Sequence, residues 1–221
     1  MSPIVLADNA STESPDEVFD IPPMMSEDRF VDWTMAQEKV RAEWVNGEVI
    51  FMSPVSARHV RLFVWLLTLL DSFSRRRKLG EVFGSEFITR MQTPSGISRR
   101  LPDIMFVTRE RRNLILKNHL EGPPDLAVEI VSPESINRDW IEKRAEYETG
   151  GVREYWIIDP DAKKFEAFTL SPQGKLVSIY NQPAGAFASI VLPGLQFQIE
   201  WLWDENPPDQ YDILKNLGVI P

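Results

Sequence analysis

A single apolar stretch, Leu126-Ala127-Val128-Glu129-Ile130-Val131, sets the architecture of this chain. Pro123-Pro124 precedes it and Ser132-Pro133 follows it, so it is typical of a strand buried on both faces. Glu129 does not fit such a strand, because an ionised carboxylate removed from water costs several kcal/mol unless it is paired, protonated or bound to a metal. The stretch therefore predicts a partner for Glu129.

Helices and strands alternate on both sides of this stretch. We expect a short helix from Ser26, a hairpin turning at Asn46-Gly47, a helix over about 56–78, strands at about 81–91 and 101–107, an arginine-rich loop over 108–122, a helix over 138–149, a strand over 154–159 and antiparallel strands over 163–199. This order predicts an α/β (α+β) layout around a mixed central sheet flanked by helices, with an N-terminal hairpin and a C-terminal antiparallel meander.

Length and composition indicate one domain with one sizeable core. The chain has 221 residues, of which 43% are hydrophobic and 26% charged. Residues 1–25 are acidic and rich in Ser and Pro, so we expect a flexible arm there. Residues 26–200 form the predicted domain, and residues 201–221 a tail that packs on this domain or on a dimer partner through Trp201 and Trp203.

The chain contains no cysteine. This absence excludes disulfides, cysteine-ligated metals and a thiol nucleophile, and it permits a reducing cytoplasm, which is the expected location. The longest apolar stretch, over 62–70, falls short of the roughly 18 residues that a membrane span needs. The N-terminus lacks the basic start of a secretion signal, so we predict no membrane partner.

The net charge of −9 argues against a protein that coats nucleic acid nonspecifically, because such binding rests on clustered positive charge. It does not exclude an enzyme that acts on nucleic acid. Positive charge gathers in three clusters, Arg75-Arg76-Arg77-Lys78, Arg99-Arg100, and Arg109 with Arg111-Arg112. These clusters are either phosphate contacts or solvated ends of helices and loops.

Asp103 repeats the anomaly of Glu129, since it stands in a second strand-like run, Leu101 to Val107. If the two strands are neighbours, the carboxylates lie side by side, and like charges in contact do not both stay ionised without a cation. Mg²⁺ or Mn²⁺, which prefer oxygen ligands, suit a chain without cysteine. The alternative is that Asp103 caps the turn after Pro102.

The helix over 138–149 brings a third charged group near this strand. Asp139, Lys143 and Tyr147 recur at every fourth position and so share one face. When the helix is taken alone, this spacing favours a surface ion pair, for which Glu142 and Arg144 are equally good partners. Because the helix follows directly after the strand of Glu129, however, its first turns can return a lysine over the end of that strand, where it would stabilise negative charge.

Taken in order, these motifs resemble the Uma2 family, also called DUF820, which is grouped with the restriction-endonuclease-like nucleases of the PD-(D/E)XK superfamily. The resemblance covers roughly residues 30–170. It rests on Pro102-Asp103, on Pro124-Asp125-Leu126-Ala127-Val128-Glu129-Ile130-Val131-Ser132-Pro133-Glu134-Ser135, on Asp139, Lys143 and Tyr147, on Gly151-Val152-Arg153-Glu154-Tyr155-Trp156-Ile157-Ile158-Asp159, and upstream on Asn46-Gly47-Glu48 and Met52-Ser53-Pro54 leading to His59.

The resemblance implies a restriction-endonuclease-like core in which Asp103 and Glu129 bind a divalent metal and Lys143 is the catalytic lysine. A literal (D/E)-X-K motif would place the lysine at position 131, where this chain has Val131, so the resemblance implies that Lys143 on the next helix takes its place. Glu48 either completes the metal shell or is an exposed hairpin residue. His59 either contacts phosphate and carries a proton, or makes a structural hydrogen bond at a helix start.

The predicted function is therefore a Mg²⁺- or Mn²⁺-dependent endonuclease that hydrolyses DNA phosphodiester bonds, acting as a homodimer. The alternative is a catalytically silent, nuclease-derived DNA-binding or assembly protein. A glycosidase using Glu129 and Asp103 as acid and base is a remote third hypothesis, because no aromatic platform for a sugar accompanies these motifs.

Overall fold

The computed structural model describes residues 24–36 and 40–221. Its helices are α1 (Glu27–Ala36), α2 (Ala57–Arg77), η1 (Arg109–Leu114), η2 (Arg138–Lys143), α3 (Arg144–Gly150), η3 (Ile199–Leu202) and α4 (Gln210–Asn216). Its strands are β1 (Ala42–Val45), β2 (Glu48–Phe51), β3 (Gly80–Gly84), β4 (Ile88–Thr93), β5 (Gly96–Arg100), β6 (Ile104–Thr108), β7 (His119–Glu121), β8 (Leu126–Ile130), β9 (Glu154–Asp159), β10 (Lys164–Leu170), β11 (Leu176–Tyr180), β12 (Ala186–Ala188) and β13 (Gln196–Gln198).

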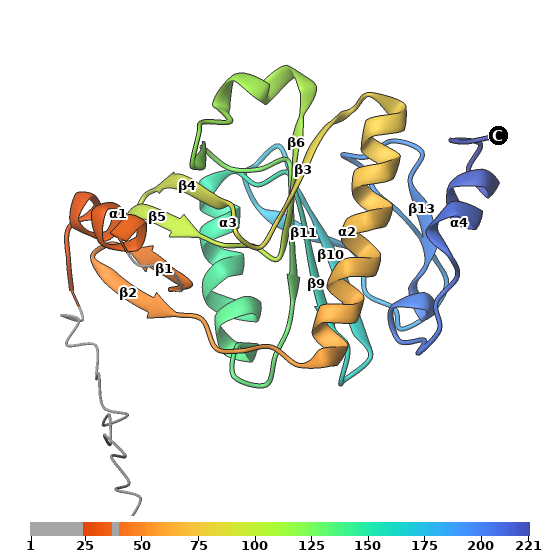
Figure 1. Ribbon diagram of the computed structural model, residues 1–221, viewed down its shortest axis with the longest axis horizontal. Coiled ribbons are helices and arrows are strands. Elements are labelled where there is room, and N and C mark those ends of the chain that lie inside the picture. Colours follow the sequence, from red (N-terminus) through yellow and green to blue (C-terminus); the bar gives the residue numbers. More distant parts are fainter. Residues whose placement is uncertain (1–23, 37–39) are drawn as a thin grey trace, which may run out of the picture.

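A six-stranded mixed sheet forms the centre of the molecule, in the order β11-β10-β9-β8-β6-β3. The strands β8 and β9 run parallel, and the other neighbours in this sheet are antiparallel. Since η2 and α3 connect β8 to β9, the parallel pair and its helical crossover form a βαβ unit. The predicted mixed sheet flanked by helices is confirmed (Figure 1).

The N-terminal hairpin, β1 with β2, belongs to a second sheet of five strands, in the order β2-β1-β5-β4-β7. The sequence predicted the hairpin but neither β5 nor β7. The strand β5 escapes a pattern search because its sequence, Gly96-Ile97-Ser98-Arg99-Arg100, is polar, and β7 is a short strand within the predicted arginine-rich loop. The site described below lies where this second sheet meets the central one.

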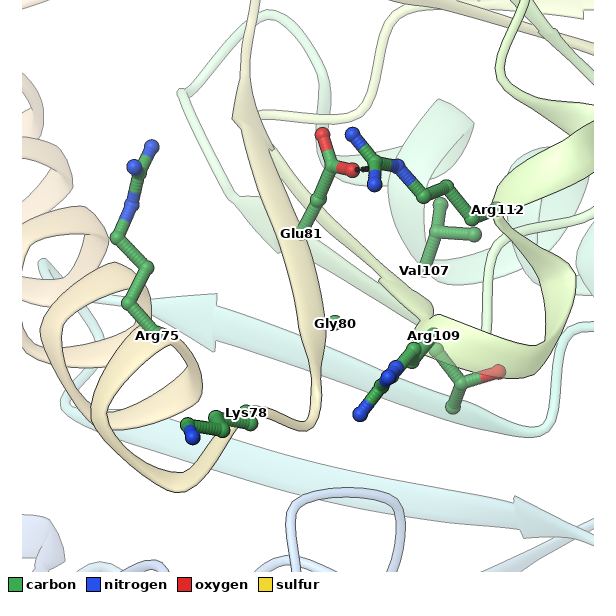
Figure 2. Close-up of a pocket in the computed structure, with 8 residues that line it drawn as sticks. Arg75, Lys78, Gly80, Glu81, Val107, Arg109 and Arg112 are labelled. Carbon is green, nitrogen blue, oxygen red and sulfur yellow. Dashed lines mark ion pairs between the residues drawn. The ribbon is translucent and has the colours of Figure 1, made fainter.

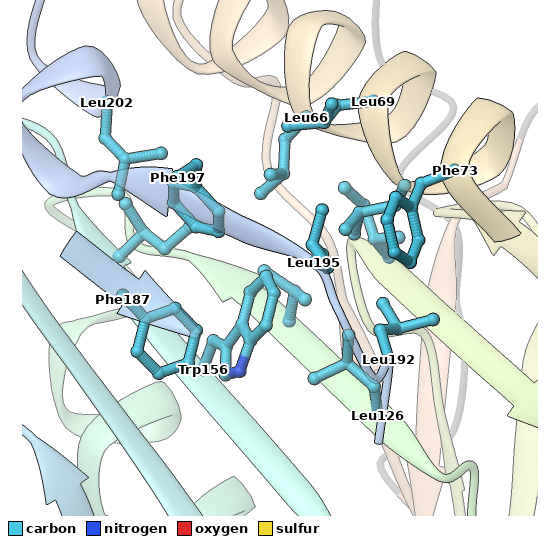
Figure 3. Packing of buried hydrophobic residues seen from close by; sticks show 14 of the residues in the cluster. Leu66, Leu69, Phe73, Leu126, Trp156, Phe187, Leu192, Leu195, Phe197 and Leu202 are labelled. Atoms are coloured by element: carbon cyan, nitrogen blue, oxygen red, sulfur yellow. The ribbon is translucent and has the colours of Figure 1, made fainter. Parts of the chain in front are cut away.

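The core of the central sheet is covered by α2 on one face. The helix begins at Ser56, whose Oγ accepts the backbone N–H of His59, and ends at Lys78, which has φ 56°. Leu66, Leu69 and Phe73 of α2 pack toward the sheet (Figure 3). The sheet presents Leu126 and Trp156 to the same core, and the C-terminal segment adds Leu192, Leu195 and Phe197. The predicted helix over 56–78 is confirmed.

The strand β8 is buried at all five of its positions, as the apolar stretch predicted. Its neighbours are β6 on one side and β9 on the other. A carboxylate in this strand therefore has no access to bulk water except at the strand end. The residues that contact Glu129 therefore determine whether its carboxylate is ionised.

The C-terminal residues close the core beside α2. Ile213 and Leu214 of α4 are buried in the main cluster, and Trp201 and Trp203 pack against it. The indole N–H of Trp65 on α2 donates to the carbonyl of Pro208 at 2.9 Å. Among the described residues, no helix combines the length and the apolar character that crossing a bilayer requires.

Most of the expected N-terminal arm, residues 1–23, lies outside the described residues. Its last two positions are held on the hairpin. The backbone N–H of Met25 donates to the carbonyl of Gly47 at 2.7 Å, and Met24 forms a bridge with Glu48.

Candidate active site

Asp103 and Glu129 lie on adjacent strands of the central sheet. Asp103 immediately precedes β6, which pairs antiparallel with β8 so that Ile104 lies opposite Val128. The Ile130 N–H donates to Asp103 Oδ2 at 2.8 Å, which fixes the Asp103 side chain against the strand of Glu129. The predicted adjacency of the two strands is confirmed.

Glu129 has an exposed fraction of 2%, and its partners inside the protein are Lys143 and Tyr147. The Lys143 Nζ donates to Glu129 Oε2 at 2.8 Å, and the Tyr147 hydroxyl donates to Glu129 Oε1 at 2.6 Å. Both carboxylate oxygens are therefore hydrogen-bonded inside the protein. The lysine does return over the strand from the following helix.

Asp139, Lys143 and Tyr147 lie on one face of the helical segment, as their spacing predicted. Lys143 Nζ is 3.4 Å from Asp139 Oδ1. The first part of the segment, η2, is a π-helix and continues directly into α3. Such π turns are rare and occur frequently at functional sites. Nothing in the sequence pattern indicated this local widening of the helix.

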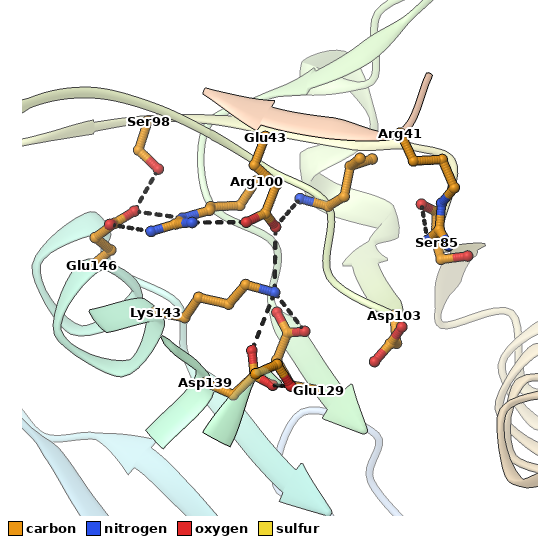
Figure 4. Close-up of polar contacts among 12 residues, drawn as sticks. Arg41, Glu43, Ser85, Ser98, Arg100, Asp103, Glu129, Asp139, Lys143 and Glu146 are labelled. Carbon is orange, nitrogen blue, oxygen red and sulfur yellow. Dashed lines mark hydrogen bonds and ion pairs between the residues drawn. The ribbon is translucent and has the colours of Figure 1, made fainter. Parts of the chain in front are cut away.

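Glu43 of β1 is a member of the cluster that the sequence analysis missed. Its side chain is fully buried, and its Oε1 lies 3.3 Å from Lys143 Nζ (Figure 4). Arg100 Nη1 donates to Glu43 Oε2 at 2.7 Å, and the Leu101 N–H donates to Oε1 at 3.0 Å. Lys143 is thus shared among the carboxylates of Glu43, Glu129 and Asp139.

The Arg99-Arg100 cluster fits neither interpretation made from the sequence, because both side chains are buried in ion pairs. Arg100 donates its Nε to Glu146 Oε2 at 2.9 Å, and Ser98 Oγ donates to the same oxygen at 2.7 Å. Arg99 Nε donates to Glu27 Oε1 at 2.6 Å. Arg100 therefore supports the site through Glu43, while Arg99 holds Glu27 of α1.

His59, in the first turn of α2, faces Asp103. Its Nε2 lies 3.3 Å from Asp103 Oδ1, while its Nδ1 is buried without a hydrogen-bond partner among the described residues. Asp139 Oδ2 accepts a short hydrogen bond from Ser135 Oγ, and within the described residues Asp139 Oδ1 makes no hydrogen bond beyond its 3.4 Å contact with Lys143 Nζ. Two polar atoms in the cluster are therefore free to accept further bonds.

Glu48 lies apart from these residues. It is exposed at the start of β2, paired in the hairpin with Val45, and its side chain does not line the cavity beside Asp103 and Glu129. Of the residues predicted for the site, the structure therefore brings together Asp103, Glu129, Lys143 and His59.

Burial and charge set the protonation of the buried acids. Burial raises the pKa of Glu129 to about 8, although Lys143 opposes this effect. Burial also raises the pKa of Asp139, again against Lys143. Burial acts in the same direction on Glu43, but Lys143 and Arg100 outweigh it and lower the pKa of Glu43 to about 2. The pKa values of Glu43 and Glu129, two carboxylates of one cluster, are therefore shifted in opposite directions from the usual value.

The Lys143 ammonium is held in its charged form. Burial alone would lower its pKa, but the surrounding Glu129, Glu43 and Asp139 together raise it. A buried lysine with a raised pKa does not serve as a base near neutral pH. It acts as a fixed positive charge.

A cavity of about 30 Å³ lies between these side chains, and it has room for about one water molecule or ion. Its lining includes His59, Asp103, Glu129, Asp139 and Lys143, together with Arg41 and Arg138. The Nε of Arg138 is buried without a hydrogen-bond partner among the described residues.

The donor chemistry of this cavity fits a hard divalent cation. Asp103, Glu129 and Asp139 present carboxylate oxygens, and Asp139 Oδ1 has only the 3.4 Å contact with Lys143 Nζ among the described residues. Across residues 24–36 and 40–221, no three Asp, Glu, His or Cys side chains are already grouped at metal-binding spacing. A bound ion would therefore require small side-chain adjustments, beginning with the release of Glu129 from Lys143.

The fold places this chain among the nuclease-like α/β proteins. It is similar to the crystal structure of "a putative nuclease belonging to DUF820 from Anabaena variabilis ATCC 29413", with a TM-score of 0.63 and 18% sequence identity. The match covers 78% of this chain and 96% of the other. No curated protein matches this chain.

The chain belongs to the Uma2 family. The family model, described as "Putative restriction endonuclease", matches residues 28–200. The predicted family and the predicted fold class are both confirmed.

Proposed function

We propose that this protein is a metal-dependent endonuclease that hydrolyses phosphodiester bonds in DNA. The observation that carries the proposal is the buried contact of 2.8 Å between Lys143 Nζ and Glu129 Oε2, beside Asp103 on the adjacent strand. A packing role does not explain the buried Glu129 and Lys143 side chains, because each is costly to bury. The family description supports the same reaction class.

Asp103 and Glu129 would hold Mg²⁺ or Mn²⁺, with Asp139 Oδ1 as a further oxygen donor. When bound, the ion supplies an activated water and stabilises the charge that develops on the phosphate. Burial raises the pKa of Glu129 to about 8, so Glu129 must release its proton as it takes up a cation. Cation binding should therefore tighten as pH rises toward 8.

Lys143 would donate to a phosphate oxygen and offset the negative charge of the transition state. Its raised pKa suits this role, because the ammonium keeps its protons. Glu43, held in turn by Arg100, keeps the Lys143 side chain at the cavity when Glu129 turns toward a cation. Arg138 lines the cavity, and its Nε, which has no hydrogen-bond partner among the described residues, is a second donor for a phosphate oxygen.

His59 would orient Asp103. Its Nε2 lies 3.3 Å from Asp103 Oδ1, so the ring limits the rotation of that carboxylate. The free Nδ1 lies on the other side of the ring and can bond a water or a substrate oxygen.

The test is DNA cleavage by Asp103→Asn, Glu129→Gln and Lys143→Met, measured on supercoiled and linear duplex DNA with Mg²⁺, Mn²⁺ or EDTA. Each substitution should lower the rate by about a hundredfold or more, and EDTA should abolish it. Glu142→Gln is the matched control, because Glu142 lies on the same π-helix but is exposed. Cleavage at the wild-type rate by Glu129→Gln would contradict the mechanism.

A catalytically silent DNA-binding or assembly protein is the second candidate. The observation that favours it is that both Glu129 oxygens already accept hydrogen bonds, one from Lys143 and one from Tyr147, and are therefore not free to bind a metal. Metal binding by calorimetry without cleavage of any DNA or RNA substrate would select this function.

We also propose that the protein acts on a duplex as a homodimer. A two-fold dimer would present one site to each antiparallel strand. Light scattering on the purified protein measures this directly, and a monomer at concentrations at which DNA is cut would exclude it.

A further inference from the structure

A second cavity, of about 530 Å³ and open to solvent, is lined by the C-terminal end of α2, the start of β3 and η1 (Figure 2). It lies at the other end of α2 from His59. Basic side chains from two separate parts of the sequence surround it. Arg75 and Lys78 come from the end of α2, and Arg109 and Arg112 come from η1. Two of the three basic clusters of the sequence therefore meet at one place.

The two sites are distinct. Thr108 lines this cavity and follows Asp103 by five positions along β6, a span of roughly 17 Å in an extended strand. Along α2, Arg75 follows His59 by sixteen positions, or roughly 24 Å of helix. Only a long ligand would contact the carboxylate cluster and this cavity at the same time.

The backbone holds the two basic segments together. The N–H of Arg109 donates to the carbonyl of Leu79 at 2.9 Å, directly after the end of α2. The strand β3, which starts at Gly80, pairs with β6 so that Gly80 lies opposite Thr108. The convergence of the arginines and the lysine is therefore a property of the fold and not of flexible side chains alone.

Positive charge exceeds negative charge around this cavity. Arg75 Nε bonds Asp71 Oδ1 at 2.7 Å, and Arg112 Nε bonds Glu81 Oε1 at 2.7 Å. In the described part of the chain, Lys78 and Arg109 form no ion pair. A local excess of cations in a chain of net charge −9 indicates a site for an anion.

The dipole of α2 accounts for only part of this excess. Basic residues at the C-terminus of a helix are favourable, which explains Arg75 and Lys78. Arg109 instead opens η1, where the dipole disfavours positive charge. The helix dipole therefore does not account for Arg109.

We propose that this cavity is a second phosphate-binding site, separate from the carboxylate cluster. Arginine and lysine together recognise phosphate oxygens through charge and several N–H donors. A volume of about 530 Å³ accommodates a nucleotide-sized group. The phosphates belong either to a nucleic acid that extends along β6 and α2 or to a free nucleotide.

The test uses the full chain with Lys78→Asn and Arg109→Gln combined. Asparagine tolerates the left-handed backbone of Lys78, at φ 56°, and both side chains are exposed, so folding should be preserved. The control, Lys117→Gln with Lys215→Gln, removes the same charge from exposed positions that do not line the cavity. All measurements are made in EDTA, so that the outcome does not depend on whether the protein cleaves DNA.

Two probes distinguish the sources of phosphate. For a labelled duplex of about 20 base pairs, the slope of log Kd against log salt should fall by about two in the double variant and stay unchanged in the control. For a free nucleotide, ATP binding measured by calorimetry should be lost in the double variant alone. Loss with either probe supports the site and identifies the source.

The proposal is overturned if the wild type binds neither probe, or if the double variant binds both as the control does. Should the double variant unfold, each single variant serves instead, with an expected change of about one in the salt slope.

Discussion

Replacing Glu129 by glutamine should make the metal-free protein more stable at alkaline pH while removing activity. The side chain is 2% exposed, and burial raises its pKa from 4.5 to about 8. Between these two values the folded protein binds more protons at Glu129 than the unfolded chain does. The stability of the wild type must therefore fall as pH rises through this window.

The size of the effect follows from the shift. A pKa raised from 4.5 to about 8 corresponds to roughly 5 kcal/mol of stability lost between those pH values. Glutamine does not titrate, and its amide keeps the shape of the protonated acid and one oxygen for Lys143 or Tyr147. The difference in the free energy of unfolding between Glu129→Gln and the wild type should therefore change by roughly 5 kcal/mol in favour of the variant.

The assay is urea unfolding at a series of pH values from 4.5 to 9, in EDTA. Glu142→Gln, which removes an exposed carboxylate from the same helical segment, should follow the wild-type curve. Parallel curves for Glu129→Gln and the wild type would refute the reasoning. Adding Mg²⁺ at pH 8 should stabilise the wild type more than the variant, because the variant lacks one of the carboxylates that would hold the cation.

Three other substitutions probe the charged and hydrogen-bonded cluster around this residue. Arg100→Met should cost about 3 to 5 kcal/mol in urea unfolding at pH 7, because it leaves the buried Glu43 carboxylate with one cation fewer; combining it with Glu43→Gln should recover part of that loss. Since the pKa of Glu43 is lowered to about 2, this carboxylate contributes roughly 3 kcal/mol to the free energy of unfolding above pH 4.5, and this contribution disappears as pH falls through 2. In Glu43→Gln, the free energy of unfolding should therefore fall less steeply between pH 4.5 and 2. Tyr147→Phe removes a hydrogen bond of 2.6 Å to Glu129, so thermal unfolding should show a loss of about 1 to 3 kcal/mol, and the alkaline decline of stability should move to higher pH. An unchanged decline would show that Tyr147 does not stabilise the ionised form.

Several members of the site were predictable because the cost of burying charge is visible locally. Glu129 stood in an apolar run, and the structure buries every residue of that strand. Asp103 repeated the pattern one strand away, and the spacing of Lys143 and Tyr147 placed them on one helix face. These inferences needed only hydrophobic runs and the helical period.

Glu43 and Arg100 escaped prediction for a physical reason. The strand of Glu43 has four residues, too few to mark its carboxylate as buried by pattern, although its place between Ala42 and Trp44 was a usable signal. Its partner Arg100 lies 57 positions away and was read as part of an exposed basic cluster. Whether an arginine faces water or a carboxylate depends on the pairing of β1 with β5, which is a long-range property.

The amino-acid sequence alone determined which side chains would be costly without partners, because desolvation depends on the apolar residues next to them in the chain. Only the tertiary structure decided which partner each received. Ion pairs and hydrogen bonds act over a few ångströms, and strand register and the return of η2 over β8 set those distances. The same folding that united Glu129, Lys143 and Glu43 carried two distant basic clusters to the far end of α2, where the sequence predicted no common site.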